Sequence, residues 1–160
     1  MSATPVLAPL PHIAEETPAD AAVVEALVLA AFGPGRFAKT AERLREGASV
    51  AAGFVARENG VGVGSVRLWP ITIGGAAALF LGPIAVGAQG RRGGLGAGLV
   101  QACLAWGGER GQGVLLVGDP PYFGRFGFEA ALGVRLPGPV DPRRILWRGP
   151  APVSGDVRPA

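Results

Sequence analysis

The stretch "LGPIAVGAQGRRGGLGAGLVQACLAW", residues 81–106, joins an apolar segment to a helical pattern through a turn that is rich in glycine. Six of the twelve residues from Gly87 onward are glycine. Beyond the turn, Leu95, Leu99 and Cys103 recur at the spacing of one helix face. The stretch therefore predicts a strand, a tight turn and a helix, in that order.

A turn of this kind attracts anions. The first N–H groups of a helix have no partner within the helix, and the helix dipole adds about half a positive charge there. Glycines let a ligand oxygen approach the backbone without a Cβ in the way, and Arg91 and Arg92 add positive charge beside the turn. We therefore expect the turn to bind a phosphate or pyrophosphate group.

Two well-known phosphate-binding loops match these glycines incompletely. The P-loop needs Lys and then Ser or Thr after its last glycine, whereas Gly96 is followed by alanine. The dinucleotide fingerprint G-x-G-x-x-G fits at Gly94 and Gly96, but its third position is Leu99. Asp119 lies where a ribose-binding acid could fall, which keeps this alternative open. Against it, such a turn normally opens its domain, and here about eighty residues precede it.

The N-terminal third of the chain carries helix signals. Thr17 and Pro18 are typical of a helix start, and Asp20 completes a capping box. Apolar residues follow at helical spacing until "GPG" at 33–35 ends the helix. A second, shorter helix is expected at residues 40–45.

Strand signals fill most of the rest. The pair Asn59-Gly60 between two β-like segments is a strong hairpin signal. Pro83 cannot donate to a sheet ladder, so we expect a bulge or an unpaired side there. Strands are expected at residues 49–57, 61–71, 77–86, 113–118, 133–137 and 144–148, the last two as a pair. This order predicts a mixed α/β (α+β) domain over residues 1–160, with its core at 12–149 and frayed ends.

Composition excludes several classes. The chain has 160 residues, 49% hydrophobic and 17% charged, and no apolar window reaches the roughly 18 to 20 residues that a membrane span needs. The first residues lack the order of a signal peptide, so we expect a cytoplasmic protein without a membrane partner. Cys103 is the only cysteine and His12 the only histidine. An intrachain disulfide and a cysteine-based metal cluster are therefore excluded, a catalytic triad is disfavoured, and no metal is expected.

The charge pattern points to small ligands. The net charge is +3, and no basic run is longer than two residues. Nucleic-acid binding therefore has no specific support, whereas scattered arginines suit a phosphate on a small ligand.

Residues 91–96 match a third phosphate-binding pattern, R/Q-x-x-G-x-G/A. The pattern and its context resemble the acyl-CoA pyrophosphate loop of the GNAT superfamily of N-acetyltransferases. The segment "GDPPYFGRFGF" at 118–128 resembles the tyrosine-bearing helix and Gly-Phe ending of that superfamily, and "FGPGRFAKTAERLREG" at 32–47 resembles its YhbS-like subgroup. The resemblance covers roughly residues 12–149. It implies a mostly antiparallel sheet with two splayed parallel strands and about four helices.

The resemblance also implies acetyl-CoA as cosubstrate, bound between splayed strands at residues 80–86 and 114–117. A bulge at Pro83 would help to break the ladder where the strands part. The pantetheine and thioester would be held by the backbone of Ile84, Ala85 and Val86. The pyrophosphate would be held by the amides of Arg91, Arg92, Gly93, Gly94, Leu95, Gly96 and Ala97.

The chain departs from the family at the catalytic acid. The family usually protonates the leaving thiolate with a tyrosine four residues before the glycine of the Gly-Phe pair, and here that position is Phe123. Tyr122, the only tyrosine, is one residue earlier, about 100 degrees around a helix. Either Tyr122 reaches the sulfur through a shifted helix, or water supplies the proton, or the protein binds acyl-CoA and turns over poorly. No general base stands out, since Asp119 is more simply an N-cap.

The acceptor side is expected to use residues from two segments. The resemblance implies a pocket formed by Arg36, Phe37, Lys39, Arg67 and Trp69, with plain surface positions as the alternative. These cations favour an acceptor that carries a carboxylate or a phosphate.

The resemblance implies an acetyl-CoA-dependent N-acetyltransferase that acts on a primary amine of a small molecule or protein. The alternative is a catalytically weak or inactive acyl-CoA sensor or interaction module of the same fold, and a nucleic-acid-binding protein is the third. Trp147 is a candidate for a homodimer contact, with a core position as its alternative.

Overall fold

The computed structural model describes residues 12–33, 49–87 and 94–160. Its strands are β1 (His12–Glu15), β2 (Ala52–Glu58), β3 (Val61–Ile73), β4 (Ala76–Val86), β5 (Val114–Val117), β6 (Glu129–Ala130), β7 (Val134–Arg135), β8 (Ile145–Arg148) and β9 (Gly155–Pro159). Its α-helices are α1 (Ala21–Phe32), α2 (Leu95–Glu109) and α3 (Pro120–Gly124).

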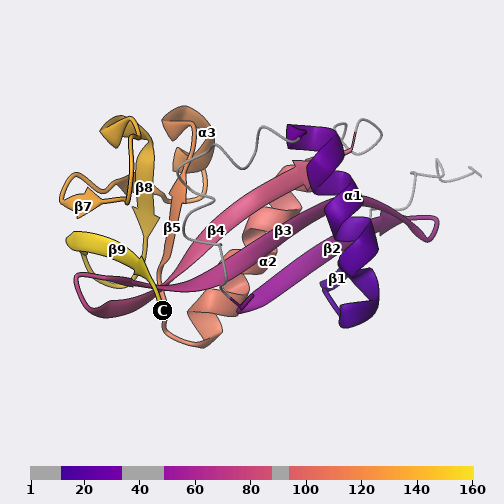
Figure 1. Ribbon diagram of the computed structural model, residues 1–160, viewed down its shortest axis with the longest axis horizontal. Helices are drawn as coiled ribbons and strands as arrows, with labels where there is room; N and C mark the ends of the chain where they lie inside the picture. Colours follow the sequence, from indigo (N-terminus) through magenta and orange to yellow (C-terminus); the bar gives the residue numbers. More distant parts are fainter. Residues whose placement is uncertain (1–11, 34–48, 88–93) are drawn as a thin grey trace, which may run out of the picture.

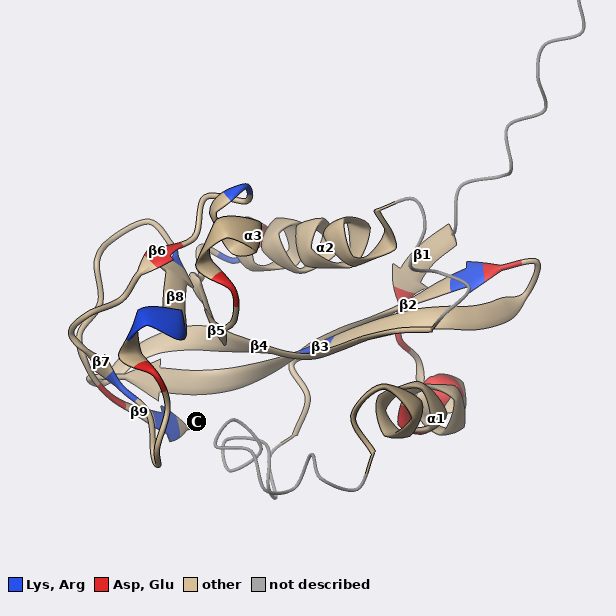
Figure 2. Ribbon diagram, turned by 90° about the horizontal axis from the view of Figure 1, so that it is seen from above, with Lys and Arg blue, Asp and Glu red and all other residues tan. Residues whose placement is uncertain are grey.

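The strands form one twisted sheet in the order β1-β2-β3-β4-β5-β8-β6, and β9 pairs with both β3 and β7 (Figure 1). The pairs β4–β5 and β7–β9 are parallel, and the other pairs are antiparallel. Figure 2 shows α2 on one face of the sheet and α1 on the other. The mixed α/β class with a mostly antiparallel sheet is therefore confirmed. The helix expected at 40–45 lies outside the described residues.

The short 3-10 turn Pro18–Asp20, which leads into α1, has the predicted capping box. The Asp20 carboxylate accepts from the backbone N–H of Thr17 at 2.8 Å and also pairs with Arg57. The Thr17 N–H first, and then Arg57, lower the pKa of Asp20 from its ordinary value. At the other end Gly33 has a φ of 64°, a left-handed conformation that glycine adopts without strain. The "GPG" sequence therefore ends the helix as expected.

The predicted hairpin joins β2 to β3. Asn59 and Gly60 have φ values of 51° and 78°, as a two-residue type I′ turn requires. The strands on either side pair antiparallel, from Glu58 opposite Val61 onward.

The strands β4 and β5 splay apart. They pair only at Leu79 with Val114 and at Phe80 with Leu115. Beyond that point β4 pairs with β3, while β5 pairs with β8. Figure 1 shows β4 and β5 diverging from the end where they meet. The ladder between β3 and β4 shifts register at Pro83, which confirms the expected bulge.

The chain end differs from the prediction. Residues 155–159 were expected to fray, but they form β9, which pairs with β3 and buries Val157. Hydropathy gave no sign of this strand because Val157 is its one buried apolar side chain and the rest of the pairing uses the backbone.

The predicted pairing of segments 133–137 and 144–148 is also wrong. Within the described residues, β7 pairs with β9, and β8 lies between β5 and β6. Ile145 and Leu146 are both buried, on opposite faces, so β8 behaves as an inner strand of the sheet. A strand that is apolar on both faces is buried best between two other strands, and β8 therefore pairs with β5 and β6 instead of β7.

The core lies on both faces of the sheet. Leu99, Val100 and Cys103 of α2 pack against Leu68 and Leu81. Cys103 is fully buried, as its place on the apolar stripe predicts, and burial raises the pKa of its thiol to about 12. None of the described helices has the length and apolar character needed to cross a membrane.

Candidate functional site

The first backbone N–H groups of α2 have no acceptor within the helix. Gly94 precedes the helix with a φ of 74°, and its carbonyl accepts from the N–H of Gly98 at 3.1 Å. The N–H groups before Gly98 therefore have no acceptor within the helix, and its first turn holds no acidic side chain. This end of α2 keeps its positive potential and can receive an anion. The expected neighbours Arg91, Arg92 and Gly93 lie outside the described residues.

Leu95 fixes this turn on the sheet. Leu95 and Leu99 are buried, and their methyl groups would lie 3.1 and 3.2 Å from a Cβ on Gly64. Glycine on β3 therefore lets the start of α2 approach the middle of the sheet closely. Because Gly64 pairs with Val86, the start of α2 is held beside the outer end of β4, away from the point where β4 and β5 meet.

The outer half of β4 has an open edge in the described structure. Ile84, Ala85 and Val86 pair with β3 on one side, and no described strand pairs with them on the side of β5. In a strand that is paired on one side, alternate N–H and C=O groups point outward. These groups can accept an extended ligand as they would accept another strand.

Tyr122 lies in α3, directly after the splayed end of β5. Asp119 caps this helix by accepting the backbone N–H of Tyr122 at 3.1 Å, so its predicted capping role is confirmed. The Tyr122 hydroxyl lies 3.2 Å from the position that a Cβ on Gly96 would occupy. The tyrosine hydroxyl and the first turn of α2 therefore meet.

The neighbouring Phe123 points elsewhere. Its ring packs against the core cluster under α2, at 5.9 Å from the ring of Phe128, and lies against Gly118. The rings of Tyr122 and Phe123 are 4.9 Å apart and nearly perpendicular. The family's usual acid position therefore holds an apolar, half-buried ring.

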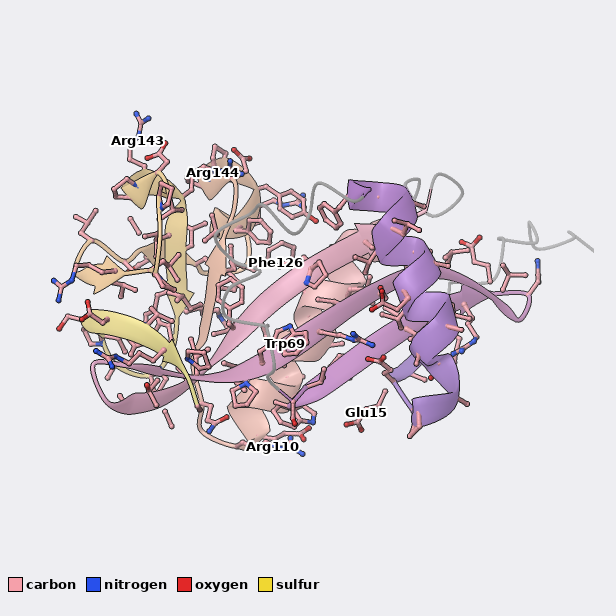
Figure 3. The ribbon with its side chains drawn as sticks, viewed as in Figure 1. Glu15, Trp69, Arg110, Phe126, Arg143 and Arg144 are labelled. Carbon is pink, nitrogen blue, oxygen red and sulfur yellow. The ribbon has the colours of Figure 1, made fainter. Side chains whose placement is uncertain are left out.

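Two further residues fix the Tyr122 ring. Arg125 lies 4.4 Å from the ring centroid and donates through Nε to the Tyr122 carbonyl at 3.2 Å. Phe126, labelled in Figure 3, makes an edge contact with the ring at 5.6 Å. The residues Tyr122, Arg125 and Phe126 form an aromatic–cation cluster beside Gly96.

On the α1 face of the sheet, Arg67 is already paired. Its guanidinium donates two hydrogen bonds to Glu16, at 3.1 and 2.6 Å, and lies 4.0 Å from Glu25. The hydrogen bond to Glu16 is the largest cause that raises the pKa of Arg67. Sequence reasoning missed Glu16, which lies 51 positions away and carries no local signal.

Trp69 is buried, and its indole N–H donates to the Gly82 carbonyl at 2.6 Å (Figure 3). Two N–H donors of Arg67 and the indole N–H of Trp69 are therefore used within the protein. The other three predicted acceptor residues, Arg36, Phe37 and Lys39, lie outside the described residues.

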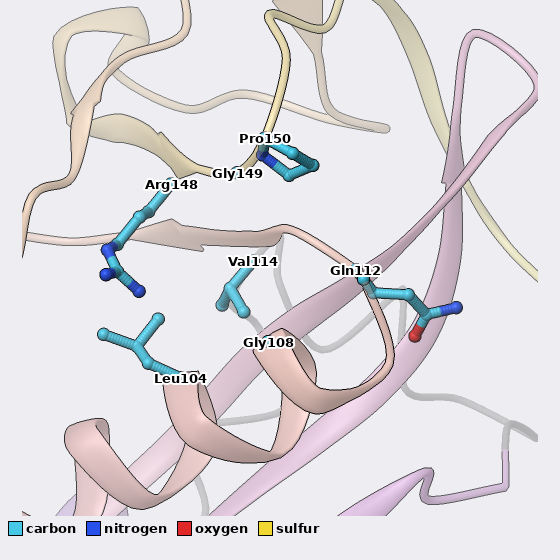
Figure 4. Close-up of a pocket in the computed structure, with 8 residues that line it drawn as sticks. Leu104, Gly108, Gln112, Val114, Arg148, Gly149 and Pro150 are labelled. Atoms are coloured by element: carbon cyan, nitrogen blue, oxygen red, sulfur yellow. The ribbon is translucent and has the colours of Figure 1, made fainter.

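A hollow of about 290 Å³ lies at the far end of α2 (Figure 4). Leu104, Gln112 and Arg148 are among its lining residues. A helix of this length spans about 22 Å, so the hollow is remote from the turn at Gly94. It takes no part in the candidate site.

Comparison with known proteins places these features in a family. The family model described as "Acetyltransferase (GNAT) family" matches residues 22–128. The chain is 35% identical to the uncharacterized N-acetyltransferase YhbS of Escherichia coli K12 over 131 residues, which cover 77% of this chain and 78% of that protein.

Two solved structures of GNAT family proteins also resemble this chain. A GNAT family N-acetyltransferase (YhbS) from Escherichia coli in complex with CoA is 29% identical, with a TM-score of 0.83 over 100% of this chain and 94% of that one. A GNAT family acetyltransferase from Brucella melitensis in complex with acetyl-CoA is also 29% identical, with a TM-score of 0.73 over 94% and 96% of the two chains.

Proposed function

Because the chain belongs to the acetyltransferase (GNAT) family, we propose that it binds acetyl-CoA and transfers the acetyl group to a primary amine. The observation that carries the proposal is the first turn of α2, whose N–H groups have no acceptor within the helix, held beside the open outer edge of β4 at Ile84 to Val86. An extended thioester with a pyrophosphate at one end matches this combination. The acceptor is a small molecule or a protein.

The phosphate end of the cofactor would lie on the glycine-rich turn. Backbone N–H groups and the dipole of α2 favour a pyrophosphate, and the glycines allow close approach. The proposed amide donors are Arg91, Arg92, Gly93, Gly94, Leu95, Gly96 and Ala97.

The pantetheine arm would continue along β4. We assign its hydrogen bonds to the backbone of Ile84, Ala85 and Val86, with the thioester further into the gap between β4 and β5. The two relatives with CoA and acetyl-CoA support this assignment, since both share the fold over most of their length.

The reaction forms a C–N bond and breaks the C–S bond of the thioester. Attack by a neutral amine puts negative charge on the carbonyl oxygen, and a backbone N–H of β4 can stabilise that charge by a few kcal/mol. The amine loses a proton and the thiolate gains one. Phe123 has no proton to give, so an acid from a protein tyrosine can only be Tyr122. A CoA thiolate is a fair leaving group, so turnover continues, more slowly, when water provides the proton.

The acceptor side would be lined by Arg67 and Trp69, with Arg36, Phe37 and Lys39 from the neighbouring loop. Because Glu16 occupies the guanidinium of Arg67, we assign Arg67 to the pocket wall. An acceptor carboxylate or phosphate would then be bound by Arg36 and Lys39.

Calorimetric titration with acetyl-CoA tests the proposal. The variant Gly94→Glu places a carboxylate in the anion site, and Gly111→Glu is its matched control. Both glycines have left-handed φ values, 74° and 67°, and no atom of the described residues within 4 Å of their Cβ positions, but Gly111 follows the far end of α2. We expect micromolar binding that Gly94→Glu abolishes and Gly111→Glu preserves. No binding to the wild type at millimolar acetyl-CoA would overturn the proposal.

The second candidate function is an acyl-CoA sensor, and Phe123 at the acid position is the observation that favours it. The variant Phe123→Tyr distinguishes the two, with Phe126→Tyr as the control on the same segment. Release of CoA thiol from acetyl-CoA is measured across a panel of amines. An enzyme that lacks its acid gains rate with Phe123→Tyr alone, whereas a sensor gives no turnover in either variant.

A further inference from the structure

We propose that Tyr122 is a cofactor-positioning residue, whose hydroxyl binds the pyrophosphate of acyl-CoA instead of protonating the thiolate. The inference rests on the proposed acyl-CoA site and replaces the acid role that the sequence suggested for this residue. It follows from where the hydroxyl lies, what holds the ring, and which charges surround it.

The hydroxyl lies at the anion-binding end of α2. It is 3.2 Å from the Cβ position of Gly96, and a Cα–Cβ bond adds about 1.5 Å, so it lies within about 5 Å of the Gly96 Cα. Gly96 is the second residue of α2, among the backbone N–H groups that have no acceptor in the helix. A phosphate oxygen that these N–H groups bind would therefore lie within reach of the tyrosine hydroxyl.

The hydroxyl is also available. The structure gives the backbone of Tyr122 its partners, at Asp119 and Arg125, but gives the hydroxyl no hydrogen-bond partner among the described residues. A tyrosine hydroxyl that is partly buried normally finds an acceptor. A phosphate oxygen supplies a charged one, which makes the stronger kind of hydrogen bond.

The packing around the Tyr122 ring hinders a rotation of the side chain that would point the hydroxyl into the gap between β4 and β5. Phe123 and Phe126 contact the ring at centroid distances of 4.9 and 5.6 Å, and Arg125 lies over its face. The side chain that α3 does send into the core is Phe123. The helix therefore directs its one hydroxyl away from the position that the family's acid normally takes.

Arg125 adds charge at the same place. No carboxylate of the described residues pairs with its guanidinium, which lies near the rings of Tyr122 and Phe126 and donates to the Tyr122 carbonyl. An unneutralised cation beside the start of α2 favours an anion there. Arg110 provides a natural control, because it lies 3.6 Å from the Trp106 centroid and donates to the Trp106 carbonyl, at the other end of α2.

The test measures binding of CoA, desulfo-CoA and 3′-dephospho-CoA to the wild-type protein and to Tyr122→Phe. Desulfo-CoA lacks the sulfur on which an acid would act, whereas all three ligands keep the pyrophosphate. We expect Tyr122→Phe to weaken all three by about tenfold, the usual cost of one hydrogen bond to a charged group. Thermal unfolding without ligand should be unchanged, because the ring and its contacts remain.

A second pair of variants tests the charge. Arg125→Gln should weaken CoA binding several-fold and reduce its dependence on salt, whereas Arg110→Gln should change neither. Equal affinity of Tyr122→Phe and the wild-type protein for CoA would overturn the inference. A loss of affinity that Tyr122→Phe shows for CoA alone, or that is absent with 3′-dephospho-CoA, would also overturn it. A wild-type protein that binds none of the three ligands would instead overturn the proposed function.

Discussion

The carboxylate of Glu16 accepts two hydrogen bonds from the guanidinium of Arg67, across the face of the sheet that α1 covers. Both side chains are largely buried, with 11% and 18% of their surface exposed. The pair closes β1 onto the middle of the sheet, since the backbone N–H of Glu16 also donates to Gly53. A pair this well shielded should matter more for stability than an exposed one.

We expect Glu16→Gln to lower the free energy of unfolding by about 1 to 3 kcal/mol, because it removes the carboxylate that is hydrogen-bonded to Arg67 and leaves only the more distant, exposed Glu25. The exposed pair between Arg135 and Asp156 is the control, and Asp156→Asn should change stability by no more than about 0.5 kcal/mol. Urea denaturation measures both. Equal changes in the free energy of unfolding for the two variants would show that the buried pair of Glu16 and Arg67 stabilises the fold no more than the exposed pair.

Replacing Ser65 should raise the free energy of unfolding. This residue is buried on β3, opposite Val55 and Ala85, and its Oγ has no hydrogen-bond partner in the described structure. Removing an unsatisfied buried hydroxyl should stabilise the fold, so we expect Ser65→Ala to raise the free energy of unfolding by about 1 kcal/mol. Exposed Ser154→Ala should stay within about 0.5 kcal/mol of wild type. A loss of stability in Ser65→Ala would mean that the hydroxyl has an acceptor.

Local chemistry is what made parts of this fold predictable from sequence. Asn59-Gly60 specifies a turn by its own backbone preferences, and Thr17 and Asp20 cap each other within one turn. The glycine-rich start of α2 is likewise a local signal, because unpaired N–H groups belong to every helix start. Pro83 predicted a bulge because its ring removes a donor wherever it falls in a strand.

Long-range pairing is what the sequence could not reveal. The strand β9 joins β3 through backbone hydrogen bonds, which leave no pattern in side-chain hydropathy. Arg67 was predicted to line the acceptor pocket, and its pairing with Glu16, 51 positions away, carries no signal in the sequence. The direction of the Tyr122 hydroxyl depends on how Phe123 packs into the core, which is decided by tertiary contacts.

The buried thiol of Cys103 predicts a pH dependence. Burial raises its pKa to about 12 in the folded chain, whereas an unfolded cysteine titrates near about 8.5. Between these values the unfolded chain loses a proton that the folded chain keeps, so stability falls as pH rises. We expect this loss to reach up to about 1.4 kcal/mol per pH unit and to be absent in Cys103→Ala. Urea denaturation from pH 8 to 11 measures it, and equal pH profiles for the two proteins would contradict it.

Gly96→Ala tests whether the contact with Tyr122 matters for the cofactor or for the fold. Gly96 has ordinary helical geometry, so alanine itself costs nothing and can add up to about 1 kcal/mol of helix stability. Its Cβ, however, would lie 3.2 Å from the Tyr122 hydroxyl and would push that group away from the turn. We therefore expect unchanged or higher stability together with a loss of CoA affinity of about tenfold.

The control is Gly108→Ala, on the same helix with no atom near its Cβ position, which should gain stability and keep its CoA affinity. The double variant of Gly96→Ala with Tyr122→Phe separates the two ways in which Gly96→Ala could act. If the methyl group acts by displacing the hydroxyl, the two losses overlap and the double variant binds CoA about as well as either single variant. If the losses of CoA affinity in the two single variants add, the methyl group blocks the cofactor directly. Wild-type affinity in Gly96→Ala would show that neither the methyl group nor the displaced hydroxyl touches the bound cofactor.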